Sequence, residues 1–61
     1  MSHSDKMRAR IAEKAHDAQI MRDYTAELAA QGKDKAAAKV WAKGEEYEAE
    51  AKFLRGRLRK L

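Results

Sequence analysis

Small and apolar residues recur at alternating spacings of three and four through the second half of the chain, and this pattern restricts the fold more than any other feature. The series is Ala37, Val40, Gly44, Tyr47, Ala51, Leu54, Leu58 and Leu61. A heptad spacing of this kind forms one stripe along a helix, where a neighbouring helix can pack. One column is small for three heptads, at Ala37, Gly44 and Ala51, which predicts a close approach of the neighbouring backbone. The general abundance of alanine is the simpler explanation of that column.

A stripe at the same spacing runs through the first half of the chain. Its members are Met7, Ile11, Lys14, Ala18, Met21, Thr25 and Leu28. Lys14 is the charged member of this series, and we expect it to interrupt the stripe. The neighbouring Ala15 can then turn into its place.

Residues that start and stop helices stand at both ends of the first stripe. Ser2 or Ser4 is a suitable N-cap, and Asp5 follows Ser2 at the spacing of a capping box. Gly32 stands where a left-handed C-cap is expected, because glycine takes that conformation without a Cβ clash. Asp34 then offers an N-cap for the second helix.

These signals predict an all-α fold with a helix over about 4–30, a turn over about 31–33 and a helix over about 34–60. The chain 1–61 is then a single helical hairpin. So short a turn makes the two helices antiparallel neighbours.

Folding the chain about residues 31–33 pairs the two stripes. Met21 then lies opposite Gly44. Leu28 lies near Ala37, so that large side chains meet small ones. The hairpin seam that follows from this pairing comprises Met21, Leu28, Val40, Gly44, Tyr47, Ala51, Leu54 and Leu58.

The size and composition of the chain exclude several classes of protein. It has 61 residues with no cysteine and no proline, so disulfides and thiolate metal sites are absent. Two helices leave no deep cleft, and we expect no enzymatic activity, no cofactor and no small-molecule substrate. No apolar run approaches the ~20 residues that span a bilayer, and no secretory signal is visible. We expect a cytoplasmic protein.

Glu13 and His16 form a Glu-x-x-His pattern, which bundled carboxylate metal sites use because both side chains share one helix face. At about 100° per residue, however, both point away from the stripe that contains Ile11. We therefore interpret them as surface residues and predict no metal site.

Four large apolar residues lie outside both stripes. A lone pair of helices cannot cover them and seldom buries enough surface to offset chain entropy. Pairing two hairpins into a four-helix bundle covers them, which predicts a homodimer. The same surface can instead dock onto a different protein. These interface candidates are Ile20, Tyr24, Trp41 and Phe53.

Charge is unevenly distributed along the predicted hairpin. The net charge is +4. The open end, residues 1–16 and 52–61, has nine Lys and Arg against two Asp and Glu, whereas the remainder has five against eight. The helix dipole favours cations at the end of the second helix and disfavours them at the start of the first. It therefore explains the basic residues of the second helix but not those of the first. The basic pole predicted to bind an anionic partner comprises Arg8, Arg10, Arg55, Arg57, Arg59 and Lys60.

Two functions fit this pole. The first is a small non-enzymatic regulator that binds nucleic acid, which we slightly favour because clustered Lys and Arg contact phosphates. The second is an interaction module, an adaptor or inhibitor, that covers an acidic surface of a larger protein. A third explanation of the basic residues is that this end is only a solvated surface that keeps the protein soluble and binds no partner. Membrane binding by the amphipathic segment 53–61 is disfavoured, because its leucines already complete the seam.

Overall fold

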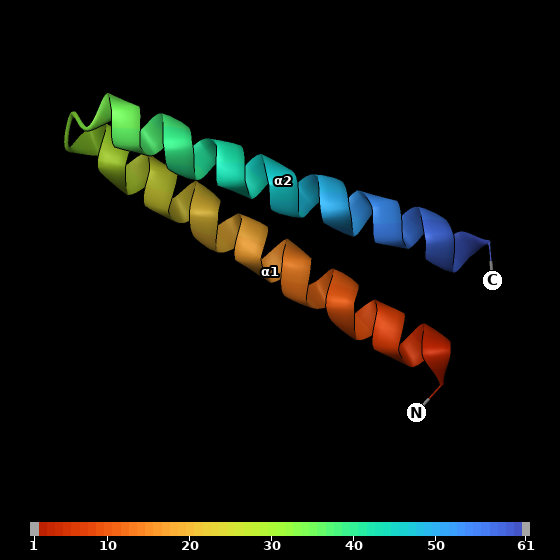
Figure 1. Ribbon diagram of the computed structural model, residues 1–61. Coiled ribbons are helices and arrows are strands. Elements are labelled where there is room, and N and C mark those ends of the chain that lie inside the picture. The colour runs from red at the N-terminus through yellow and green to blue at the C-terminus, as the bar shows by residue number, and fades with distance from the viewer. Residues whose placement is uncertain (1, 61) are drawn as a thin grey trace.

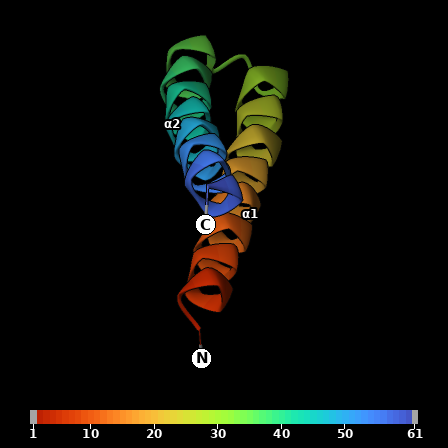
Figure 2. The same cartoon turned by 90° about the vertical axis from the view of Figure 1, so that its right-hand side faces the viewer.

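The protein folds into two long antiparallel helices that pack against each other. The computed structural model describes residues 2–60, which form α1 (His3–Ala30) and α2 (Asp34–Arg59). The hairpin is a rod about 45 Å long, with its turn at one end and both chain termini at the other, as Figures 1 and 2 show. Within residues 2–60 neither helix is apolar over a length that could cross a membrane.

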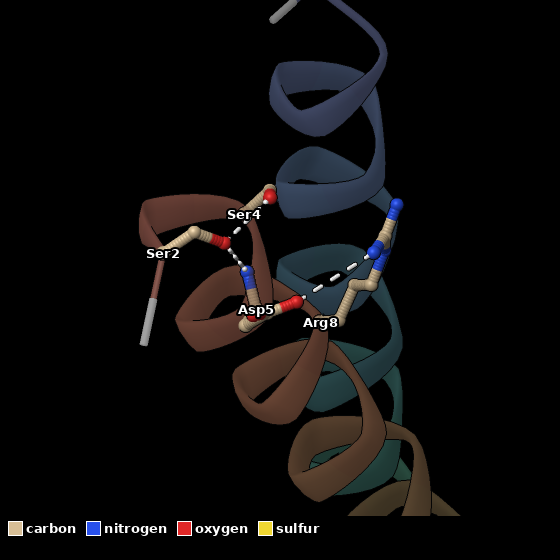
Figure 3. A network of polar contacts seen from close by, with 4 residues as sticks. All are labelled: Ser2, Ser4, Asp5 and Arg8. Carbon is tan, nitrogen blue, oxygen red and sulfur yellow. Dashed lines mark hydrogen bonds and ion pairs between the residues drawn. The ribbon is translucent and has the colours of Figure 1, made fainter.

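Ser2 caps the start of α1. Its extended backbone precedes the helix, and its hydroxyl accepts a hydrogen bond of 3.2 Å from the backbone N–H of Asp5. This bond satisfies one of the N–H groups that a helix start leaves without a partner. The Asp5 carboxylate lies 3.7 Å from the guanidinium of Arg8 (Figure 3). The cap expected from the serine spacing is therefore present at Ser2.

The turn is a Schellman motif built on Gly32. This glycine has a φ of 77°, in the left-handed region that a Cβ disfavours. Its N–H donates to the carbonyl of Ala29 at 3.0 Å, and the N–H of Lys33 donates to the carbonyl of Leu28 at 2.9 Å. Both bonds satisfy carbonyls at the end of α1. The chain reverses here, which makes the helices neighbours.

The start of α2 differs from the sequence prediction. Lys33, not Asp34, is its N-cap residue, and no side chain caps the helix there. Because Lys33 already takes part in the Schellman turn, Asp34 becomes the first helical residue. Its carboxylate then complements the helix dipole without bonding a free N–H. At the other end α2 continues through Gly56 as far as Arg59.

Both stripes form the contact between the helices. Met7, Ile11, Ala18 and Leu28 of α1 are buried. In α2 the small column is the buried one, at Ala37, Gly44 and Ala51. The large α2 column lies beside it and is half-buried at Val40, Tyr47 and Leu54. Leu58, one heptad after Ala51, is half-buried as well. The last position expected in this stripe, Leu61, lies outside the described residues.

The helices approach closely at Gly44. A Cβ placed on this glycine would lie 3.1 Å from the Cβ of Met21 and 3.6 Å from the carbonyl oxygen of Ala18. Met21 therefore lies opposite Gly44, and the two backbones are close because Gly44 has no side chain. A Cβ placed on Gly56 would meet nothing within 4 Å.

Lys14 stays within the stripe, contrary to the expectation that it interrupts it. Its side chain is only 25% exposed, and its Nζ lies 3.3 Å from a carboxylate oxygen of Glu50. The same Nζ lies 5.2 Å from the centre of the Tyr47 ring. The aliphatic part of a lysine can cover apolar surface while its ammonium reaches a partner, which explains why the charge is tolerated here.

We predict opposite effects of adding one methyl group at the two helical glycines. Gly56→Ala raises the free energy of unfolding by about 1 kcal/mol, because alanine is the better helix former and the site is open. Gly44→Ala has the same helix-forming advantage but pushes Met21 away, and we expect its melting temperature to fall below that of the parent. Circular dichroism melts at one protein concentration measure both. Equal rises for the two variants would mean that the helices do not approach closely at Gly44.

Candidate nucleic-acid interface

The hairpin has two broad faces, and its helical geometry assigns each side chain to one of them. Successive helical residues are turned by about 100°, so residues two apart point in nearly opposite directions and residues seven apart point the same way. An ion pair between Arg22 of α1 and Glu48 of α2 joins the helices on one side. Arg8 lies two heptads before Arg22, and Arg55 lies one heptad after Glu48. These four residues therefore share a face.

Arginines from both helices meet on this face at the open end. Arg8 of α1 and Arg55 and Arg59 of α2 line one surface hollow of about 410 Å³. Leu58, the last described seam residue, lines the same hollow and is half-buried. Figure 3 shows the Arg8 side chain extending across α2. Leu58 adds an apolar contact beside three guanidinium groups.

A second hollow of about 550 Å³ continues this surface along α2. It shares Arg55 and Arg59 with the first, so the two are continuous. Its lining residues are Glu45, Glu48, Ala49, Lys52, Arg55 and Arg59. We call the surface that carries Arg8, Lys52, Arg55 and Arg59 the arginine face.

Charges on the arginine face are only partly balanced. Within residues 2–60, Arg55 and Arg59 form no ion pair, and Arg8 has the 3.7 Å contact with Asp5 between two well-exposed side chains. Further along, hydrogen bonding and charge attraction by Glu48 raise the pKa of the Arg22 guanidinium above its ordinary value. Arg22 and Glu48 therefore balance each other, whereas the arginines at the open end remain available to an anion.

The other half of the predicted basic pole lies on the opposite side. Arg10 is two residues from Arg8, and Arg57 is two residues from Arg55. The Arg57 guanidinium lies over the ring of Phe53, 5.9 Å from its centre. Lys60 follows Phe53 by one heptad and shares its side. The structure thus divides the six predicted residues into two groups of three.

The exposed apolar side chains are divided in the same way. Ile20 and Tyr24 each lie two residues from Arg22 and so point away from the arginine face; Phe53 lies two residues from Arg55 and does likewise. They are 45%, 48% and 63% exposed respectively. We call Ile20, Tyr24 and Phe53 the apolar face. Trp41, one heptad before Glu48, lies on the arginine side instead.

Two residues that line this surface are not among the six predicted binding residues. The sequence includes Lys52 in the cluster of Lys and Arg over residues 52–60 without singling it out, and it assigns Leu58 to the seam. The signal for Lys52 is its spacing of three and seven from Arg55 and Arg59, which puts all three on one side of α2. Leu58 lines the hollow because the helix pair ends there and nothing covers its outer side.

No group of three His, Cys, Asp or Glu side chains in residues 2–60 is arranged to hold a metal ion. Glu13 and His16 are both exposed.

Comparison of the chain with known protein families, with curated proteins and with solved structures finds no match. Function therefore has to be inferred from the surface itself.

Proposed function

We propose that the protein is a small non-enzymatic regulator that binds nucleic acid through its arginine face. The observation that supports this is the convergence of Arg8, Arg55 and Arg59 from two helices on one hollow. Guanidinium groups present several donors in a fixed fork and suit phosphate oxygens. A cytoplasmic location, where nucleic acid is accessible, belongs to the same proposal.

The physical basis of such binding is the release of counterions from the phosphate backbone. Each phosphate that a protein neutralises makes the affinity more salt-dependent, by a log-log slope of about −0.9 on duplex and −0.7 on single strands. Arg8, Lys52, Arg55 and Arg59 allow a few such contacts. Because phosphate contacts carry little sequence information, the expected specificity is modest.

Replacing the three arginines of the hollow tests this proposal. We expect the triple variant Arg8→Gln, Arg55→Gln and Arg59→Gln to bind a labelled oligonucleotide more weakly, with a salt slope shallower by about 2 to 3. The matched control replaces Arg10, Arg57 and Lys60 by Gln, which removes the same charge from the opposite side, and sedimentation verifies that it keeps the parent's oligomeric state. Fluorescence anisotropy between about 50 and 200 mM salt measures both.

Equal loss in the two triple variants would contradict a role specific to the arginine face and would indicate a general effect of net charge. Absence of binding by the parent protein at 50 mM salt would remove the nucleic-acid proposal.

The alternative, an adaptor or inhibitor docking on a larger protein, is favoured by the four large apolar side chains that are exposed within residues 2–60. In that case a captured protein survives nuclease treatment, and alanine at Trp41, Tyr24 or Phe53 weakens its capture.

Self-association into a homodimer is the second part of the proposal. The exposed area is 4784 Å², whereas a compact folded chain of 6.9 kDa exposes about 4,000 Å². The excess of about 800 Å² reflects the elongated shape of the hairpin, whose long sides are left open to a second copy. In addition, no large side chain within residues 2–60 is fully buried, so the isolated hairpin has a thin core.

The apolar face is the surface that we propose for this pairing. Ile20, Tyr24 and Phe53 provide the exposed apolar area on that side, and two hairpins packed there form a four-helix bundle. The arginine faces of both copies then remain on the outside of the dimer. Pairing through the opposite side would cover Arg8 and Arg55.

Polar substitutions on the two faces distinguish these arrangements. We expect the double variant Tyr24→Gln and Phe53→Gln to sediment as a monomer at micromolar concentration and to lose helix on dilution. Trp41→Gln is the control, because Trp41 lies on the arginine side, and it stays dimeric. Analytical ultracentrifugation with circular dichroism measures both properties. A parent protein that sediments as one chain would contradict the homodimer, and a monomeric Trp41→Gln variant would place the contact on the other face.

A further inference from the structure

Trp41 is the largest exposed apolar side chain on the arginine side of the hairpin. It is 55% exposed and takes no part in the seam. It lies away from the apolar face of Ile20, Tyr24 and Phe53, so the proposed dimer does not cover it. An exposed indole on the same side of the rod as the arginine face suggests a ligand that has both a negative backbone and flat apolar groups.

The positions of Trp41 and the arginines form one strip along α2. The larger hollow begins at Glu45, one turn after Trp41, and ends at Arg55 and Arg59. At 1.5 Å per residue, Trp41 and Arg55 are about 21 Å apart along the helix. That distance corresponds to about six nucleotides at the 3.4 Å spacing of a stacked strand. A single strand lying along the strip can contact both ends.

We infer that the strip from Trp41 to Arg59 binds single-stranded nucleic acid, with the indole stacked on a base and the arginine face on the phosphates. This inference rests on the proposed function and specifies its substrate class. Proteins that bind single strands combine a basic track with aromatic side chains on which bases stack. The flat face of a base is accessible in a single strand and covered in a duplex. Trp41 therefore contributes to the binding of a single strand and not to the binding of a duplex.

Two carboxylates lie along the strip and decide how strongly it attracts phosphates. Glu48 is paired with Arg22, so its charge is balanced. Glu45 has no ion-pair partner within residues 2–60 and lies between Trp41 and Lys52. A strand that spans the strip has to pass Glu45. Glu45→Gln is therefore expected to tighten single-strand binding, without any new contact.

The test uses Trp41 as its own reporter, because it is the single tryptophan of the chain. An oligothymidylate of 15 nucleotides and a duplex of equal length are titrated into the full chain at 50 mM salt. We expect the single strand to quench the tryptophan emission and the duplex to leave it nearly unchanged. Anisotropy of labelled oligonucleotides then gives the affinities of the variants. Trp41→Ala weakens single-strand binding about tenfold and leaves duplex binding unchanged.

Three further measurements make the result decisive. Trp41→Phe keeps a stacking ring and recovers most of the lost affinity, whereas Trp41→Leu keeps apolar bulk without a ring and does not recover it. Circular dichroism verifies that each variant keeps the parent's helix content. Binding without a change in emission, or equal losses for strand and duplex in Trp41→Ala, would overturn the inference while leaving the proposed function standing. No binding of either nucleic acid would overturn both.

Discussion

The close approach of the two helices at Gly44 is the contact on which the rest of the hairpin depends. A Cβ placed on Gly44 would lie 3.1 Å from the Cβ of Met21 and 3.6 Å from the carbonyl oxygen of Ala18, so the absence of a side chain there allows the approach. Ala37 and Ala51 extend the same small column by a heptad in each direction, and both are buried. A thin core results, because small residues bring backbones together but bury little area of their own. Several of the larger apolar side chains therefore remain on the surface, at Ile20, Tyr24, Trp41 and Phe53.

That surplus is sorted between two sides of a rod. Ile20, Tyr24 and Phe53 lie on one side, and the hollow of Arg8, Arg55 and Arg59 lies on the other. The sorting follows from helix geometry, since side chains two residues apart cannot share a face. The proposed self-association and the proposed anion binding would therefore use separate surfaces, and neither would have to displace the other.

The helices, the turn and the seam could be predicted because their signals are local. Gly32 marks the turn through its own backbone conformation, and the heptad spacing identifies Met21 and Gly44 as partners. The N-cap of α2 could not be predicted. Lys33 takes that position in place of Asp34 because its N–H is bonded to Leu28 in the preceding turn. The prediction of one basic pole rests on the height of each residue along the rod and leaves out its angle around the helix. Arg55 and Arg57 therefore counted as neighbours, although the sequence itself contains the two-residue spacing that separates them.

Lys14 has a consequence for how the helices align. Its ammonium lies against Glu50, and the residues one heptad to either side of Glu50 are Lys43 and Arg57. If α1 slid along α2 by seven residues in either direction, the small and large columns would still match over much of their length. Lys14, however, would then face a cation in place of a carboxylate. A repeating stripe is degenerate in its alignment. The short turn already selects one alignment within a chain, and the Lys14 charge reinforces that choice because both neighbouring alignments would be repulsive.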